Sequence, residues 1–179
     1  AYAMKVYSYE DGEINPFFEN ELRFSSISHP NIIKMIKSES KAVRRSQSST
    51  KNFSYILLEL APYGDFSGFV LSHTFPRDEK IARTYFHQLV SAVEHLHSKG
   101  MVHLDLKLDN LLLGDQFQLK VTDFDSSSMV DDLIIPCTGT PGYRAPEVRE
   151  GNIRRPKAAD IYSMGIILFA LLTGTLPYQ

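Results

Sequence analysis

The stretch VHLDLKLDNLLL, Val102 to Leu113, places ionisable side chains inside the most apolar neighbourhood of the chain. Without its polar residues, this run would be typical of a buried strand. Asp105, Lys107 and Asn110 cannot all be buried without partners, because an unpaired polar group in an apolar environment costs free energy. The stretch therefore predicts that a polar ligand binds at this place in the fold.

A second stretch, KVTDFD, ends a predicted strand with an acid, Asp123, and carries Asp125 shortly after it. Asp123 and Asn110 together would supply hard oxygen ligands, which Mg²⁺ prefers when it also holds phosphate oxygens. Asp105 would then be free to act on a proton. The two stretches together predict a site for magnesium and phosphate.

The composition limits the classes of protein to consider. The chain has 179 residues, of which 43% are hydrophobic, so one domain with an apolar core is expected. Its 19 basic and 21 acidic residues nearly balance, and we therefore expect neither nucleic acid nor a membrane as a partner. The single cysteine, Cys137, cannot form an internal disulfide, and the first residues lack the apolar run of a secretory signal. These features favour an intracellular, cytoplasmic protein.

The hydrophobic periodicity divides the chain into a mixed first part and a mostly helical second part. Helical spacing predicts a helix at residues 15–28, and residues 37–52, rich in Ser, Lys and Arg, are predicted to form a solvated hairpin loop. The predicted strands are residues 2–8, 31–36 and 53–60.

Pro62, Gly64 and Gly68 interrupt this pattern, so we place the crossing between two lobes near residues 59–65. A linker there would line a cleft. The following segment, 77–100, has apolar residues at helical spacing, acidic residues near its start and a glycine at its end, as in an amphipathic helix. Helical packing or exposure explains its histidines, His95 and His97, better than metal binding does.

The apolar run at residues 164–174 is too short to span a bilayer and favours a buried helix.

Several motifs, in order, resemble those of eukaryotic protein kinases. HLDLKLDN resembles the catalytic loop, and DFD resembles the magnesium-binding motif. GTPGYRAPE resembles the end of the activation segment, and AMK resembles the strand that carries the ATP-binding lysine. The resemblance implies an α+β, bilobal kinase-like fold, with a partial N-terminal lobe in residues 1–60 and a partial C-terminal lobe in 61–179. It further implies a fragment that lacks the glycine-rich loop and the last helices. HPNIIKMI and ADIYSMGIILFALLTGTLPY are most similar to the calcium/calmodulin-dependent group.

The resemblance implies a role for each polar residue named above. Lys5 would hold the α- and β-phosphates of ATP, and Asp123 and Asn110 would hold Mg²⁺. Asp105 would accept the proton of the substrate hydroxyl, and Lys107 would neutralise the γ-phosphate. A lysine at this position indicates Ser or Thr in a protein substrate as the acceptor.

The resemblance also implies where the rest of the nucleotide would bind. The linker would meet the adenine edge through its backbone, and apolar side chains would cover both faces of the base. The residues so assigned are Leu58 as gatekeeper, Glu59 and Ala61 at the adenine edge, Asp65 at the ribose, Ala3 and Leu112 on the faces of the base, Thr140 beside Asp105, and Asp160 between the catalytic loop and the long central helix.

Two residues depart from the family pattern. Leu104 stands where most members have an arginine that pairs with a phosphorylated activation loop, so we predict that activity does not depend on phosphate bound there. Thr138 and Ser126 to Ser128 remain weak candidates for modification. Asp125 replaces the usual glycine, and because Asp is less free than Gly in left-handed backbone, the loop is expected to favour one arrangement.

The helix glutamate that should pair with Lys5 has two possible registers. The usual spacing from HPNI points to Asn20, whereas a loop shorter by one residue points to Glu21. With Asn20, Phe24 would lie one turn on and pack on Phe124, and with Glu21 that place would belong to Ser25. We favour Glu21, because a positioned lysine needs a counter-charge.

Two functions follow from these residues. The first is transfer of the γ-phosphate of ATP, with Mg²⁺, to Ser or Thr of a protein. The alternative is a pseudokinase, a binding or regulatory module without phosphotransfer, which Leu104, Asp125, the helix glutamate and the missing glycine-rich loop would favour. The oligomeric state is not indicated by the sequence.

Overall fold

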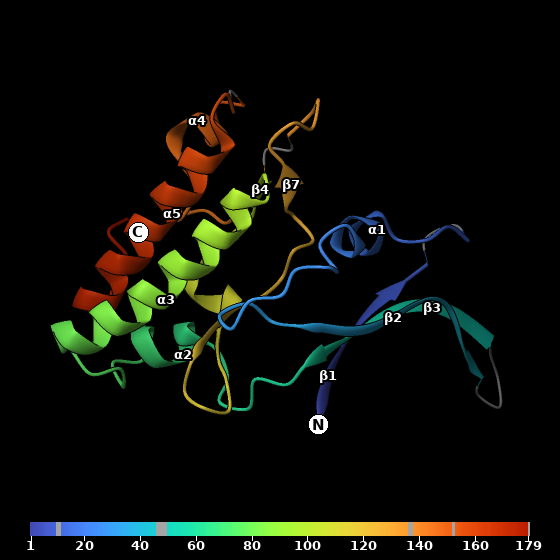
Figure 1. Cartoon of the computed structure of the whole chain (residues 1–179), viewed down its shortest axis with the longest axis horizontal. Coiled ribbons are helices and arrows are strands. Elements are labelled where there is room, and N and C mark those ends of the chain that lie inside the picture. Colours follow the sequence, from blue (N-terminus) through green and yellow to red (C-terminus); the bar gives the residue numbers. More distant parts are fainter. Residues whose placement is uncertain (10–11, 46–49, 136–137, 152, 179) are drawn as a thin grey trace.

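A three-stranded antiparallel sheet, in the order β1-β3-β2, is built by the first part of the chain (Figure 1). Its strands are β1 (Tyr2–Ser8), β2 (Met35–Arg45) and β3 (Thr50–Glu59). The register places Lys5 opposite Ile56. The computed structural model describes residues 1–9, 12–45, 50–135, 138–151 and 153–178, so Cys137 lies outside the described residues.

Helix α1 (Pro16–Leu22) lies beside this sheet and packs against it. Asn15 accepts a hydrogen bond from the Phe17 amide, and Pro16 occupies the first turn, where its missing N–H costs nothing. Phe18 is buried with Tyr7 and Ile56 of the sheet. This apolar cluster fixes which face of α1 meets β1, and therefore where the polar residues of α1 point.

Two predicted elements of the first part are shorter than expected. The helix predicted at 15–28 ends at Leu22, because the chain then forms successive turns in which each amide bonds the carbonyl three residues before it. The strand predicted at 31–36 begins only at Met35, and before it Ile32 forms an isolated bridge with Val121.

The solvated loop predicted at 37–52 is wrong over most of its length. Residues 37–45 belong to β2 and 50–52 to β3, and the four residues 46–49 lie outside the described part. The physical reason is that the ladder between two strands is made by backbone groups, which polar side chains do not remove. Irregular pairing at Glu39–Ala42 interrupts the ribbon.

The second part of the chain is mainly helical. Helix α2 (Phe66–Leu71) follows the linker, α3 (Glu79–Ser98) crosses the lobe, and α5 (Pro156–Thr173) packs beside α3. The shorter elements are β4 (Met101–Val102), the 3₁₀ turn η1 (Leu108–Asn110), β5 (Leu111–Leu113), β6 (Leu119–Val121), β7 (Ser128–Met129) and α4 (Pro146–Arg149). The predicted helix 77–100 is confirmed, with Asp78 as its N-cap.

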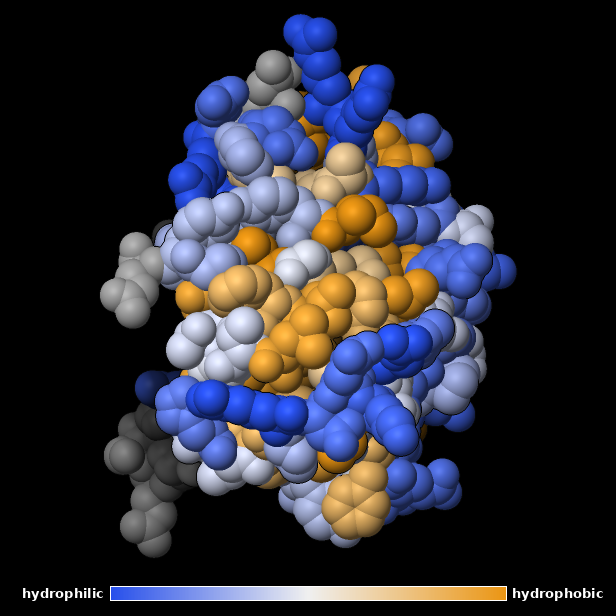
Figure 2. Space-filling view, turned by 90° about the vertical axis from the view of Figure 1, so that its left-hand side faces the viewer, coloured by the Kyte–Doolittle hydropathy of each residue, from blue (hydrophilic) through white to orange (hydrophobic). Residues whose placement is uncertain are grey.

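Helix α5 is a core helix that also leaves an apolar face outward. By length and composition alone it could cross a membrane, but Ile167, Ala170 and Leu171 are packed in the main core. On its outer side Ile161 and Phe169 are exposed. Figure 2 shows apolar residues gathered across the middle of this side of the molecule, with polar residues around them.

Candidate active site

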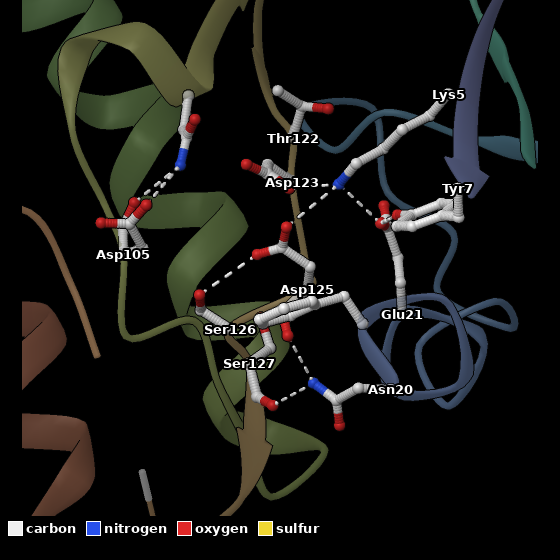
Figure 3. Close-up of polar contacts among 12 residues, drawn as sticks. Lys5, Tyr7, Asn20, Glu21, Asp105, Thr122, Asp123, Asp125, Ser126 and Ser127 are labelled. Carbon is white, nitrogen blue, oxygen red and sulfur yellow. Dashed lines mark hydrogen bonds and ion pairs between the residues drawn. The ribbon is translucent and has the colours of Figure 1, made fainter. Parts of the chain in front are cut away.

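Lys5 joins three segments that are far apart in the sequence (Figure 3). Its Nζ lies 2.8 Å from Oε2 of Glu21 on α1 and 2.5 Å from Oδ1 of Asp123, which follows β6. Asp125 is a third carboxylate, with Oδ2 at 3.4 Å from the same nitrogen. The charge of one lysine is therefore shared among three acids.

The contact of Lys5 with Glu21 decides the register of α1 in favour of Glu21. The expected consequence for Phe24 is wrong, however, because the ring of Phe24 still stacks on Phe124, with centroids 6.0 Å apart. After α1 ends at Leu22, the tight turn brings Phe24 round, with its amide bonded to the Glu21 carbonyl. One segment therefore supplies both the counter-charge and the ring.

Glu21 is a buried charge, with only 2% of its surface exposed. It is held by Lys5 and by the hydroxyl of Tyr7, which donates to Oε2. Burial lowers the pKa of Lys5, but the charge of Glu21 and the contacts with Asp123 outweigh it, so the pKa rises and the lysine stays charged. Burial, together with the bond to Glu21, raises the pKa of Tyr7, which stays a donor.

Asp123 and Asp125 differ in backbone and in environment. Asp123 has a φ of 69°, in the left-handed region, whereas Asp125 is not among the residues with positive φ, so the missing glycine imposes no such strain. Burial alone would raise the pKa of Asp123, but the hydrogen bond and charge of Lys5 lower it overall. Asp123 is therefore ionised near neutral pH.

Asp105 lies at the centre of a second polar group, formed by the catalytic loop and residue 140. Thr140 Oγ1 donates to Oδ1 of Asp105 at 2.7 Å, and Lys107 Nζ lies 2.8 Å from its Oδ2. Lys107 also donates to Thr140 Oγ1 at 2.8 Å. Asn110 Nδ2 donates to the Asp105 carbonyl and to Oδ2, at 2.9 and 3.2 Å. The carboxylate is thus held on several sides.

The loop that carries Asp105 is held by Asp160 of α5, as expected from the sequence. Asp160 is fully buried and accepts bonds from the backbone amides of His103 and Leu104, at 3.0 and 2.8 Å. His97 of α3 also contacts it, with Nε2 at 2.8 Å from Oδ2. Leu104 has a φ of 65°, and these bonds hold its left-handed backbone in place.

Asn110 and Asp123 are compatible with one Mg²⁺ that also binds phosphate. The amide of Thr122 donates to the Asn110 carbonyl at 3.0 Å, which brings the two residues' segments together. Because the side-chain nitrogen of Asn110 is turned to Asp105, its oxygen is the atom that would face a metal. No group of three His, Cys, Asp or Glu side chains placed to hold a metal occurs among the residues described. The remaining ligands would have to be phosphate oxygens and water.

Four of the residues assigned to the adenine end form two pairs in the structure. Ala3 pairs with Leu58 across the sheet, and Asp65 forms an isolated bridge with Leu112. Oδ1 of Asp65 accepts the Gly68 amide as the N-cap of α2, which leaves Oδ2 as the oxygen better suited to accept from a ribose hydroxyl.

Glu59 has a second partner that the sequence did not indicate. Its backbone amide donates to the Lys34 carbonyl at 3.0 Å, and its Oε1 accepts from the Lys34 amide at 2.9 Å. Its side chain forms an ion pair with Lys120 on β6, at 2.7 Å. This pair ties the end of β3, from which the linker continues through Ala61, to β6.

Other contributing residues could not have been found from the sequence, because none belongs to a motif. Tyr7 is part of an ordinary strand pattern, and the positions of His95 and His97 in a helical pattern indicated only packing or exposure. The contacts missed are those of Tyr7 with Glu21, Asn20 with the backbone of Asp125 and Ser127, Arg23 with Asp132, His97 with Asp160, and Lys120 with Glu59.

Comparisons with known proteins agree with this geometry. The family model described as "Protein kinase domain" matches residues 1–179. CBL-interacting protein kinase 32 of Oryza sativa subsp. japonica is 38% identical over 158 residues, which are 86% of this chain and 34% of that protein. CBL-interacting serine/threonine-protein kinase 24 of Arabidopsis thaliana is 41% identical over 156 residues, 86% of this chain and 33% of that protein.

The chain thus spans less than half the length of the curated relatives it matches. Its sheet with one helix, its mainly helical second part and the full-length family match all agree with the fold expected from the motifs. The chain belongs to the eukaryotic protein kinase family, in its serine/threonine group similar to the calcium/calmodulin-dependent kinases.

Proposed function

We propose that the protein transfers the γ-phosphate of ATP, with Mg²⁺, to a Ser or Thr hydroxyl of a protein substrate. The observation that carries this proposal is that the structure forms both polar groups, the one around Lys5 and the one around Asp105. Lys5 is held by buried Glu21, and Asp105 is held by Thr140 and Lys107. One group is suited to bind phosphates and the other to take a proton.

The chemistry of the step follows from where these side chains lie. Asp105 accepts the proton of the substrate hydroxyl. The hydroxyl oxygen bonds to the γ-phosphorus while the bond from that phosphorus to the ADP oxygen breaks. Lys107 neutralises charge on the transferred group, and Lys5 holds the α- and β-phosphates. Asp123 and Asn110 would hold Mg²⁺, which when bound would supply positive charge to the phosphate oxygens.

The pseudokinase alternative has lost one of its reasons, because Glu21 does pair with Lys5. The relatives are named as kinases, which also supports phosphotransfer. A protein substrate, the absence of nucleic acid and membrane partners, and an intracellular location stay predictions. So does the division into lobes at residues 60 and 61.

The test is transfer of labelled γ-phosphate to a generic basic protein by the complete natural protein with Mg²⁺. Asp105→Asn removes the proton acceptor and keeps the size of the side chain, so we expect label to fall by at least about a thousandfold, in the range that loss of a central catalytic group costs. Asp115→Asn, at an exposed turn, is the matched control and should keep activity. Equal activity of Asp105→Asn and the natural protein would overturn the proposal.

A further inference from the structure

The segment that follows Phe124 is attached to the catalytic loop on one side. In it, β7 pairs with β4, matching Met129 with Met101 and Ser128 with Val102. The hydroxyl of Ser127 donates to the His103 carbonyl at 3.2 Å. These contacts fix the segment to the part of the molecule that holds Asp105.

On its other side the same segment is attached to α1. Asn20 Nδ2 donates to the backbone carbonyls of Asp125 and Ser127, at 2.8 and 2.9 Å (Figure 3). Arg23 Nη2 lies 2.8 Å from Oδ1 and 3.0 Å from Oδ2 of Asp132. Arg23 also donates to Asn20 Oδ1 at 3.2 Å. Asn20 of α1 and Arg23, the residue that follows α1, therefore act together on one segment.

Asp132 is well placed to carry a permanent charge. Its Oδ2 also accepts the Met129 amide at 2.9 Å, so the carboxylate is fixed to β7. The hydrogen bond from Arg23 lowers the pKa of Asp132 below its usual value. The ion pair is therefore formed at neutral pH without any modification of the chain.

Helix α1 needs such external support. It has 7 residues, and a helix of this length is marginal in water unless packing holds it. Phe18 anchors its apolar side in the sheet, and Glu21 carries the charge that holds Lys5. A small rotation of α1 would move Glu21 away from Lys5, so the contacts of Asn20 and Arg23, which flank Glu21 in the chain, bear on the site.

The place of the expected arginine is occupied by an apolar contact. Leu104 is buried in a cluster with Ala145 and Val148, and Val130 and Ile135 of the same segment pack against this cluster. Ser127 and Ser128 are buried as well, at 1% and 3% exposure, so these two hydroxyls are not open to modification. The segment is thus held by apolar packing and by its own carboxylate.

We infer that Asn20, Arg23 and Asp132 are positioning residues that hold α1 against the segment after Phe124, so that Glu21 stays on Lys5 without a phosphate on the segment. The inference rests on the proposed phosphotransfer for its kinetic test. The carboxylate of Asp132 supplies the negative charge, and Arg23, at the C-cap of α1, pairs with it.

The test uses the complete natural protein treated with a phosphatase, which is then removed. We expect activity to persist after this treatment. Asp132→Asn keeps an acceptor for the Met129 amide but removes the charge, and should lower kcat and raise the KM for ATP by about three- to tenfold each, as for loss of one charged hydrogen bond. Asn20→Ala should act in the same direction. Asp131→Asn, an exposed neighbouring acid, is the matched control and should change neither constant.

Exchanging the charges of residues 23 and 132 separates a positioning role of this ion pair from a role in the stability of the fold alone. Arg23→Asp with Asp132→Arg should restore part of the loss seen with either change alone, because the attraction is rebuilt in the opposite sense. Hydrogen exchange of the α1 amides should be faster in Asp132→Asn than in Asp131→Asn. Equal constants and equal exchange in these two variants would overturn the inference, as would loss of activity on phosphatase treatment.

The two proposals can fail separately. If the natural protein transfers phosphate and Asp132→Asn behaves as Asp131→Asn does, phosphotransfer stands and the positioning role is wrong. If the natural protein transfers no phosphate, the proposed function is wrong, and exchange in α1 alone decides the positioning role.

Discussion

The polar group around Lys5 and the one around Asp105 are built in opposite ways. Asp105, Lys107 and Asn110 come from one loop, and only Thr140 is brought in from elsewhere. Lys5 instead meets Glu21 from a helix and Asp123 from beyond a distant strand. The first group depends on local backbone, whereas the second depends on how the sheet, α1 and β6 are placed relative to one another.

Burial sets Glu21 apart, because the side chains of its neighbours Lys5, Asp123 and Asp125 are 29%, 31% and 27% exposed. The side chain of Glu21 is 3% exposed, while those of Lys107 and Asp105 are 20% and 12% exposed. A charge without its partner costs more when it is buried, because water cannot replace the partner. The comparison therefore predicts that damage to the Lys5 group affects stability as well as activity, and damage to the Asp105 group mainly activity.

The largest expected difference in stability is between two changes of lysine to methionine. Lys5→Met leaves Glu21 buried with only Tyr7 as a partner, and should lower the free energy of unfolding by about 3 kcal/mol. Lys107→Met should lower it by about 1 kcal/mol or less, since water can reach Asp105. Urea unfolding followed by circular dichroism measures both. Equal losses would show that the two groups do not differ in this way.

Thr140 tests the contact of the Asp105 carboxylate with a distant part of the chain. Thr140→Ala removes the bond to Asp105 and should lower kcat by about ten- to a hundredfold, as expected for a hydrogen bond to a charged group. Thr140→Ser keeps the hydroxyl and should lose much less. Steady-state kinetics with a protein substrate gives the comparison. An alanine variant as active as the serine variant would mean that the loop alone positions Asp105.

A change at Asp125 tests how the charge of Lys5 is shared, because Asp125 lies farther from Lys5 than Glu21 and Asp123 do. It competes with phosphate oxygens for Lys5, so Asp125→Gly should lower the KM for ATP by about two- to threefold, as for a weak, partly exposed ion pair. Asp125→Asn separates charge from backbone freedom and should give the same change. If only the glycine variant binds ATP more tightly, the effect comes from the backbone.

The smallest effect is the pH dependence of the pair of Arg23 and Asp132. The pKa of Asp132 is lowered in the folded protein, so its contribution to stability is present above the unfolded pKa and is lost as pH falls through the folded pKa. The difference in unfolding free energy between the natural protein and Asp132→Asn should be constant above about pH 5 and vanish in stronger acid. Urea unfolding at several pH values measures it. A difference that persists in strong acid would mean that the charge is not what stabilises.

Much of the helical part could be predicted from the sequence, because its signals are local. The apolar spacing and the acidic residues near its start mark α3, the alternation marks β1, and the run at 53–60 marks most of β3. The hairpin arms at 37–45 and 50–52 were not predictable in this way, because their pairing depends on backbone bonds between polar strands. The end of α1 likewise depends on backbone turns that no pattern of residues in the sequence predicts.

By itself, the sequence determined the chemical identity of the site. Asp105, Lys107 and Asn110 lie within six residues of one another, so they belong to one loop and lie close together in space whatever the rest of the fold does. Tertiary structure alone decided that Glu21, and not Asn20, meets Lys5, and that Asn20 and Arg23 contact the segment after Phe124. The physical reason is that these contacts depend on the rotation of a short helix, which is set by the burial of Phe18 and by partners more than a hundred residues away.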